Sequence, residues 1–187
     1  MNVPNRLTVL RVVMVPFFVF FLMAEGIPHH LLVALVIFGV ASYTDHLDGK
    51  IARRDHLITD FGKFMDPLAD KILVMAAIIC FVALGYTNVW LALLIMFREF
   101  AVTSVRLVAA GSGKVIAANK WGKLKTVSQI VAICVILFLQ YVLGFFPELS
   151  MEFFFIGEGF MAIATFFALF SGYIYLKENF DAIRQMK

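Results

Sequence analysis

Long apolar stretches alternate with short polar connections along the whole chain. A helix needs roughly 20 apolar residues to cross the hydrocarbon core of a bilayer. The pattern predicts six such helices, over residues 8–25, 31–53, 63–84, 88–110, 125–145 and 152–176. The second stretch becomes polar at Asp45 and the third becomes apolar only after Lys71, which indicates two helix ends that meet at one membrane face. We therefore expect an all-α integral membrane protein.

Composition supports a membrane protein and limits its partners. Hydrophobic residues make up 62% of the 187 residues, well above the usage of soluble domains. The length predicts one polytopic domain, residues 1–187, and the net charge of +3 gives no indication of a nucleic-acid partner. Cys80 and Cys134 lie in apolar runs, so we expect packing residues, with a disulfide or a metal role as the alternative.

Basic residues are distributed unevenly between the two sets of helix ends. The connections near 24–30, 85–88 and 144–152 hold no Lys or Arg and carry Glu25, Glu148 and Glu152 instead. The positive-inside rule then places both termini and the polar segment after Asp45 on the cytoplasmic side. A cleaved signal peptide is the alternative for the first apolar run, but Ala24-Glu25-Gly26 is a poor cleavage site.

Carboxylates on helical spacing mark the polar segment. The pattern D-x2-D-G-x2-A-R-x8-G-x3-D-x3-D places fixed residues at Asp45, Asp48, Gly49, Ala52, Arg53, Gly62, Asp66 and Asp70. Residues three or four apart share a helix face, so two facing helices could present four carboxylates to one centre. Oxygen ligands favour Mg, Mn or Ca over Zn. The alternatives are interfacial acids paired with nearby Lys and Arg, or the ion site of a divalent-cation transporter.

This pattern is identified as the signature of the CDP-alcohol phosphotransferase family, with every position matched. The segments "NVPNRLTVLR", "TDHLDGKIARRDHLITDFGKFMDPLADK", "FREFAVTSVRLVAA" and "WGKLKT" resemble the bacterial phosphatidylglycerophosphate synthases. The resemblance covers most of residues 1–130. His46 stands where such enzymes often have Trp, which we expect to affect local packing only.

The resemblance implies transfer of a phosphatidyl group from CDP-diacylglycerol to sn-glycerol 3-phosphate, with release of CMP. Asp45, Asp48 and Asp66 would then hold two divalent cations, Mg or Mn. Asp70 would act as the general base and could also contact a metal. The same family uses other acceptors, so inositol phosphate, serine and phosphatidylglycerol stay open as alternatives. The resemblance also implies a homodimer in the bacterial plasma membrane, with the active site facing the cytoplasm.

A second group of residues is expected at the CDP-lipid. Arg53 can make a bidentate contact with the diphosphate, while Gly49, Ala52 and Gly62 leave room for the nucleotide. By resemblance, Asn5, Thr8 and Arg11 help to close the nucleotide site. The alternative for these N-terminal residues is a helix cap at Asn5 and a snorkelling Arg11.

The acceptor phosphate needs a basic pocket. Basic residues in the fourth predicted helix and in the segment after it could form one. The candidates are Arg98, Arg106, Lys123 and Lys125, with Lys63 and Lys120 as further candidates. Arg98 lies too deep in its helix to face lipid, so we expect it to face a polar cavity. We expect Glu99 to point away from Arg98 and to pair with Arg106, seven residues on. The alternative for Lys114 and Lys120 is that they bind no substrate and only set the orientation in the membrane, as the positive-inside rule describes.

Polar and small residues in the last predicted helix form a further group. Glu158 interrupts the apolar pattern. Two roles stay open for it: pairing with a polar group inside the bundle, or lining a dimer contact. Gly157, Gly159 and Gly172 could allow close helix approach.

Overall fold

The computed structural model describes the backbone of residues 3–54, 60–111 and 120–179, and the side chains of residues 8–44, 71–109 and 120–179. Within these ranges the chain forms six long helices and no strand. They are α1 (Val3–Met23), α2 (His30–Arg54), α3 (Asp60–Ala83), α4 (Val89–Gly111), α5 (Lys120–Leu143) and α6 (Ser150–Glu178), with a short 3-10 helix, η1 (Pro147–Leu149), before α6. The all-α prediction is confirmed, and a helix forms in each of the six predicted apolar stretches.

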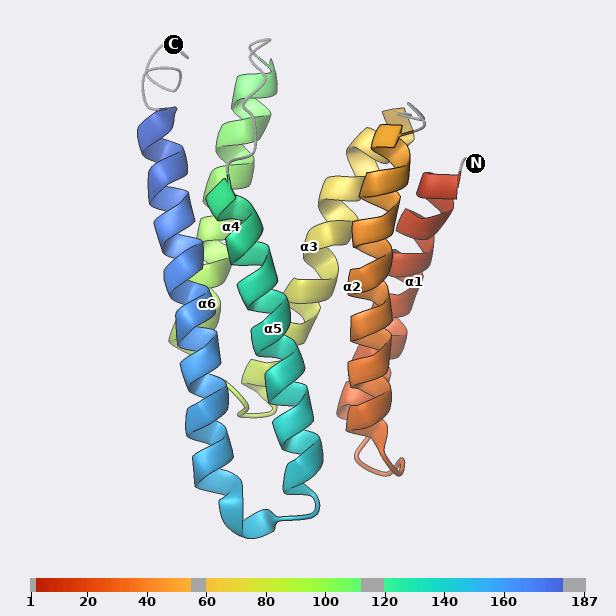
Figure 1. Cartoon of the computed structure of the whole chain (residues 1–187), viewed down its shortest axis with the longest axis vertical. Coiled ribbons are helices and arrows are strands. Elements are labelled where there is room, and N and C mark those ends of the chain that lie inside the picture. The colour runs from red at the N-terminus through yellow and green to blue at the C-terminus, as the bar shows by residue number, and fades with distance from the viewer. Residues whose placement is uncertain (1–2, 55–59, 112–119, 180–187) are drawn as a thin grey trace.

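The helices form two groups of three that share one long axis (Figure 1). In the first group α1 packs against both α2 and α3, and in the second α6 packs against both α4 and α5. Contacts of α2 with α5, and of α3 with α4 and α5, join the groups. The end of α2 and the start of α3 lie at the same end of the bundle, with the start of α1 and the end of α6 (Figure 1). We call this the aspartate end.

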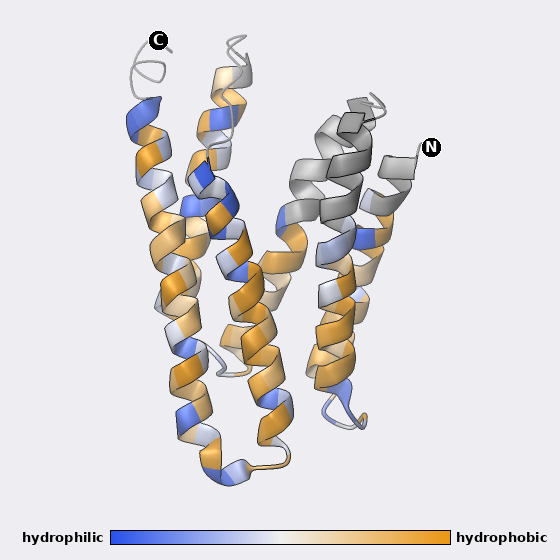
Figure 2. Cartoon of the chain, in the orientation of Figure 1, coloured by the Kyte–Doolittle hydropathy of each residue, from blue (hydrophilic) through white to orange (hydrophobic). Residues whose placement is uncertain are grey.

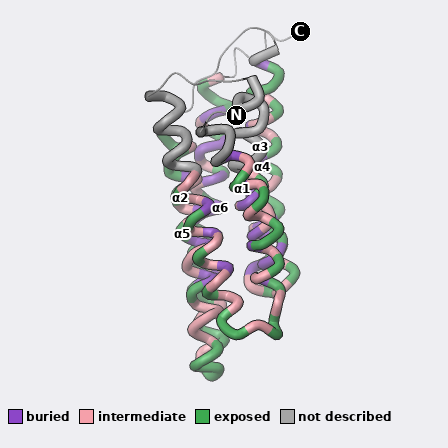
Figure 3. The backbone as a smooth tube through the Cα atoms, turned by 90° about the vertical axis from the view of Figure 1, so that its right-hand side faces the viewer, coloured by how far each residue is buried: buried purple, intermediate pink, exposed green. Residues whose placement is uncertain are grey.

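Aromatic and aliphatic side chains fill the interior between the helices. Phe18 of α1 and Phe38 of α2 are fully buried, with ring centroids 5.6 Å apart. Phe81, Ile95 and Ile133 extend the same core from α3, α4 and α5. Each helix alternates between buried and exposed positions along its length (Figure 3). Both cysteines are free thiols, with Cys80 buried in this core, so the packing role is confirmed and the disulfide alternative is wrong.

The outer surface is also apolar. Apolar residues dominate the described lengths of the helices (Figure 2), and large side chains such as Phe97, Phe155 and Phe166 are more than 60% exposed. An apolar surface of this extent is typical of contact with lipid. Within the described residues, α5 and the segment Pro147–Glu178 are long and apolar enough to cross a membrane. The described apolar parts of α1, α2 and α3 are shorter, so six crossings stay a prediction.

Glu158 links α6 to the first turn of α4 at the end opposite the aspartates. Its carboxylate accepts a hydrogen bond from the Thr87 hydroxyl at 2.8 Å and from the Asn88 backbone N–H at 3.2 Å. Acidic groups at a helix N-terminus satisfy its unpaired N–H groups and favour the helix dipole. The structure therefore gives Glu158 the helix-capping role that the sequence pattern did not reveal.

The glycines of α6 differ in how closely other helices approach them. A Cβ at Gly157 would lie 3.1 Å from Ile136 of α5, and one at Gly172 would lie 3.0 Å from Arg98 of α4. A Cβ at Gly159 would meet no described atom within 4 Å. Close approach is thus confirmed at Gly157 and Gly172 and is wrong for Gly159.

Candidate active site

The predicted metal ligands lie on two helices at one end of the bundle. Asp45 and Asp48 belong to α2, and Asp66 and Asp70 belong to α3. Their side chains lie outside the described residues, as do those of Asn5, Gly49, Ala52, Arg53, Gly62 and Lys63. Among the side chains that are described, no group of three His, Cys, Asp or Glu could hold a metal ion. The helical backbone and the all-oxygen donor set fit Mg or Mn, and the metal site stays a prediction.

α1 brings two buried polar residues toward this end. Thr8 and Arg11 are only 1% and 2% exposed, which excludes a snorkelling Arg11. α1 begins at Val3, so Asn5 lies inside the first turn and not at the cap. A helix cap at Asn5 and a snorkelling Arg11 are therefore both wrong. A role at the nucleotide site stays a prediction for Asn5, Thr8 and Arg11.

Glu99 of α4 is the centre of a buried charged cluster. Its Oε1 accepts from Arg98 Nη1 at 3.1 Å and also from the ammonium of Lys125 on α5. All three residues are at most 9% exposed. The expectation that Glu99 turns away from Arg98 and pairs with Arg106 is wrong. A buried carboxylate needs cationic partners, and Lys125 supplies one from a neighbouring helix.

Arg98 is held against α6 by hydrogen bonds. Its Nε donates to the backbone oxygen of Ala168 at 3.0 Å, and its Nη2 donates to Ser171 Oγ at 2.8 Å. The side chain passes over Gly172, where any larger residue would meet it. The burial of Arg98 is balanced by these hydrogen bonds to α6 and by Glu99, and a polar cavity beside it stays a prediction.

Lys71 extends this network to the helix that carries Asp70. Its ammonium donates to the Thr103 hydroxyl, which in turn donates to the backbone oxygen of Glu99 at 2.6 Å. Lys71 directly follows Asp70 on α3. Sequence reasoning missed both Lys71 and the role of Glu99. The spacing of Glu99 and Thr103, four residues apart on one helix face, is the only signal that could have suggested part of the network.

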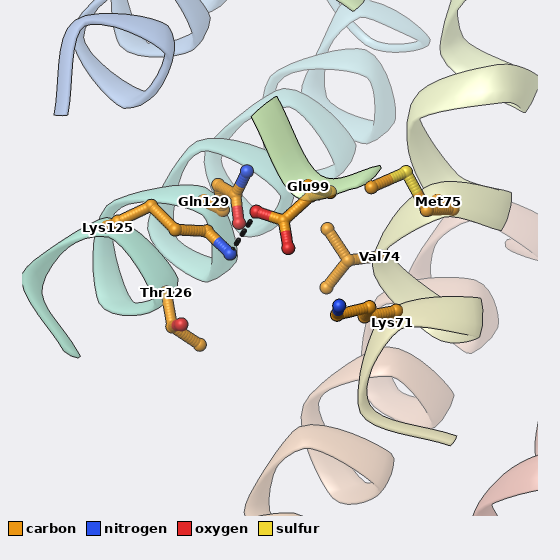
Figure 4. Close-up of a pocket in the computed structure, with 7 residues that line it drawn as sticks. All are labelled: Lys71, Val74, Met75, Glu99, Lys125, Thr126 and Gln129. Carbon is orange, nitrogen blue, oxygen red and sulfur yellow. Dashed lines mark ion pairs between the residues drawn. The ribbon is translucent and has the colours of Figure 1, made fainter. Parts of the chain in front are cut away.

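A small pocket opens between α3, α4 and α5 beside this network (Figure 4). Polar groups of Lys71, Glu99, Lys125 and Gln129 line it, with Thr126, Val74 and Met75 completing the wall. Lys125 is the one predicted acceptor residue among these lining side chains.

The other described acceptor candidates lie elsewhere. Lys120, Lys123 and Arg106 are exposed, and the Arg106 guanidinium stacks over the Tyr175 ring at 5.3 Å from its centroid. The structure therefore brings Arg98 and Lys125 together through Glu99, and among the described residues no hydrogen bond or ion pair joins the other three to this cluster. Their contact with an acceptor stays a prediction.

Comparison with known proteins agrees with the sequence pattern. Residues 1–172 match the family described as CDP-alcohol phosphatidyltransferase. A protein of Bacillus subtilis (strain 168) is 39% identical over 98% of this chain and 97% of its own length. One from Rickettsia typhi (strain Wilmington) is 34% identical over 94% of this chain and 96% of its own length. One from Haemophilus influenzae (strain Rd) is 38% identical over 71% of this chain and 73% of its own length. All three are named CDP-diacylglycerol–glycerol-3-phosphate 3-phosphatidyltransferase.

Proposed function

Because this chain belongs to the CDP-alcohol phosphatidyltransferase family, we propose that it transfers the phosphatidyl group of CDP-diacylglycerol to sn-glycerol 3-phosphate. The products would be phosphatidylglycerophosphate and CMP. The near full-length similarity to the Bacillus subtilis and Rickettsia typhi enzymes, whose names state these two substrates, supports the assignment. Family membership also removes the main support for a divalent-cation transporter.

The buried Arg98–Glu99–Lys125 cluster is the structural observation that carries the choice of acceptor. Two cations, Arg98 and Lys125, contact the Glu99 carboxylate inside the bundle. A phosphate on the acceptor suits such a site, because its oxygens can accept charge-assisted hydrogen bonds from the buried cations. Glycerol 3-phosphate meets this requirement.

The chemistry assigned to the aspartate end follows from the needs of the reaction. A hydroxyl oxygen of the acceptor forms a bond to the phosphorus that carries diacylglycerol, and the bond from that phosphorus to the CMP oxygen breaks. Asp70 accepts the proton of the attacking hydroxyl. Arg53 binds the diphosphate oxygens in a bidentate contact. Asp45, Asp48, Asp66 and Asp70 would hold divalent cations, which when bound neutralise charge on the diphosphate.

The proposed topology places this chemistry at the cytoplasmic face of a multi-pass membrane protein. All six helices would cross the membrane, with both termini and the aspartate end inside the cell. The absence of Lys and Arg from the connections near 24–30, 85–88 and 144–152 supports this orientation. CDP-diacylglycerol would enter from the lipid and glycerol 3-phosphate from the cytoplasm. A homodimer, as the family resemblance implies, completes the proposal.

An acceptor screen tests this function. Purified protein in detergent with labelled CDP-diacylglycerol and Mg or Mn is offered glycerol 3-phosphate, inositol phosphate, serine or phosphatidylglycerol, and CMP release is measured. We expect release with glycerol 3-phosphate and little with the other three. Faster release with any other acceptor would overturn the assignment, and equal release with no acceptor would indicate hydrolysis only.

A further inference from the structure

The residues assigned to the reaction are divided between the two groups of helices. The four aspartates belong to α2 and α3 of the first group. The acceptor candidates whose side chains are described, Arg98 and Lys125 among them, belong to α4 and α5 of the second group. Attack requires the acceptor hydroxyl to lie about 3–3.5 Å from phosphorus. The relative position of the two groups therefore sets the geometry of attack.

The two groups are joined at the end opposite the aspartates. The connection between α3 and α4 lies at that end, where His29 Nδ1 also lies 3.0 Å from the Tyr141 hydroxyl of α5. Elsewhere α3 packs against α1 far more extensively than against α4. Figure 1 shows α3 and α4 separating toward the aspartate end. A contact between α3 and α4 nearer the aspartates therefore has a large influence on the spacing of the two groups.

Thr103 of α4 provides such a contact through Lys71 of α3. The Lys71 ammonium donates to the Thr103 hydroxyl oxygen, and Lys71 directly follows Asp70 in the chain. A threonine hydroxyl has one proton, and here that proton is donated to the backbone oxygen of Glu99 at 2.6 Å. The lone pairs of the hydroxyl oxygen can then accept from the ammonium. Both side chains are half-buried, and surroundings of low polarity strengthen a hydrogen bond.

We propose that Thr103 is a positioning residue for the reaction. Through its hydrogen bond with Lys71 it holds α3, and with it Asp70, at a fixed distance from the turn of α4 that carries Arg98 and Glu99. Thr103 acts through Lys71 and binds neither substrate itself. The inference rests on the proposed function and deepens it, because it names the contact that aligns the attacking hydroxyl with the reacting phosphorus.

The test measures kcat and both KM values of Thr103→Val and Thr103→Ser by CMP release. Valine has nearly the shape of threonine and cannot accept from Lys71, whereas serine keeps the hydroxyl. We expect the kcat of Thr103→Val to fall about tenfold or more, because small misalignments of reacting groups slow the chemical step. Both KM values should change by less than about threefold, since each substrate stays bound to its own group of helices. Thr103→Ser should keep kcat within about threefold of wild type.

A second substitution tests the contact from α3, and a matched control tests the hydroxyl alone. Lys71→Met removes the ammonium and should by itself lower kcat about tenfold or more, so the test does not depend on the folding of Thr103→Val. In the Lys71→Met background, Thr103→Val should change kcat by less than about twofold further. The control is Thr165→Val on α6. The Thr165 hydroxyl also donates to a backbone oxygen four residues earlier, that of Met161 at 2.8 Å, and no Lys or Arg among the described side chains bonds to it. This variant should keep kcat and both KM values near those of wild type.

The outcomes distinguish this inference from the function on which it rests. A normal kcat in Thr103→Val or in Lys71→Met, or equal losses in Thr103→Val and Thr165→Val, would overturn the inference. A loss from Thr103→Val that persists in full in the Lys71→Met background would also overturn it, because Thr103 would then act without Lys71. Wild-type turnover with glycerol 3-phosphate tests the proposed function alone. A wild type that uses another acceptor rejects that function, and the same comparison of kcat values is then made with that acceptor.

Discussion

Arg98 and Glu99 are consecutive residues of α4, yet Arg98 Nη1 lies 3.1 Å from Glu99 Oε1 inside the bundle. Neighbouring helix residues point about 100° apart, so both long side chains must bend toward a shared position. Lys125 meets the same carboxylate from α5. One buried carboxylate thus contacts two buried cations from two helices.

Replacement of Glu99 should therefore destabilise the fold. Glu99→Gln removes the carboxylate that Arg98 and Lys125 both contact, and we expect a loss of about 3 kcal/mol, as is typical when a buried pair loses one partner. Thermal unfolding in detergent measures the change. Glu152→Gln, at an exposed position in the first turn of α6, should stay within about 0.5 kcal/mol of wild type. Equal shifts in the two variants would contradict a central role for Glu99.

The contact between Gly172 and Arg98 predicts a contrast between two glycines of one helix. A Cβ at Gly172 would lie 3.0 Å from Arg98 Cγ, and Arg98 cannot shift freely because Ala168, Ser171 and Glu99 hold its guanidinium. We expect Gly172→Ala to cost about 1–3 kcal/mol and to raise the KM for glycerol 3-phosphate. Gly159→Ala, which meets no described atom within 4 Å, should be neutral or stabilising by up to about 1 kcal/mol. Similar unfolding temperatures for both variants would argue against the tight approach.

Lys125→Ala should weaken the binding of glycerol 3-phosphate much more than that of CDP-diacylglycerol. Lys125 lines the pocket and is 8% exposed, so loss of a charge-assisted contact should raise the KM for glycerol 3-phosphate about tenfold or more. The KM for CDP-diacylglycerol should change by less than about twofold, because that lipid is assigned to other residues. Steady-state CMP release at varied concentrations of each substrate gives both constants. The exposed Lys177→Ala serves as the comparison, and equal effects of Lys125→Ala on both substrates would remove Lys125 from the acceptor pocket.

Asp70→Asn tests the assignment of the general base. The amide cannot take the proton of the attacking hydroxyl, so kcat should fall by at least about 100-fold. CDP-diacylglycerol binding, measured by equilibrium binding of labelled lipid, and the elution volume on gel filtration should stay near those of the wild type. Near-normal turnover would exclude Asp70 as the base.

Asp48→Ala tests the metal site separately. Removal of one carboxylate ligand should abolish the Mg- or Mn-dependent activity, because the remaining oxygens cannot hold the cations with the same affinity. Activity is measured as CMP release over a wide range of Mg concentration. Full recovery at high Mg would argue against direct ligation by Asp48.

The helices and the family could be predicted from the sequence, because both depend on local features of the chain. Long apolar runs predict the helices α1 to α6, since a helix in an apolar environment satisfies its own backbone groups. The eight-residue pattern from Asp45 to Asp70 depends on the order of residues within two adjacent helices, so it needs no tertiary contact to be recognised. The helical backbone found at all four aspartates agrees with that local spacing.

The acceptor side could be predicted only in part. Arg98 and Lys125 were predicted as cations, but the partner of each comes from a distant part of the chain: Glu99 for Lys125, and Ala168 and Ser171 for Arg98. The role of Glu158 at the start of α4 was missed for the same reason, because Thr87 and Asn88 are far from it in sequence.

The sequence by itself thus determined that this is a helical protein of a CDP-alcohol phosphatidyltransferase type, with its carboxylates at one end of the bundle. Those features arise from periodicity and short spacings, which local backbone geometry converts directly into structure. Only the tertiary structure decided which cations share Glu99, that Arg98 is anchored on α6, and that Lys71 of α3 donates to Thr103 of α4. These pairings depend on how α3, α4, α5 and α6 pack, and packing between distant helices leaves no regular period in the chain.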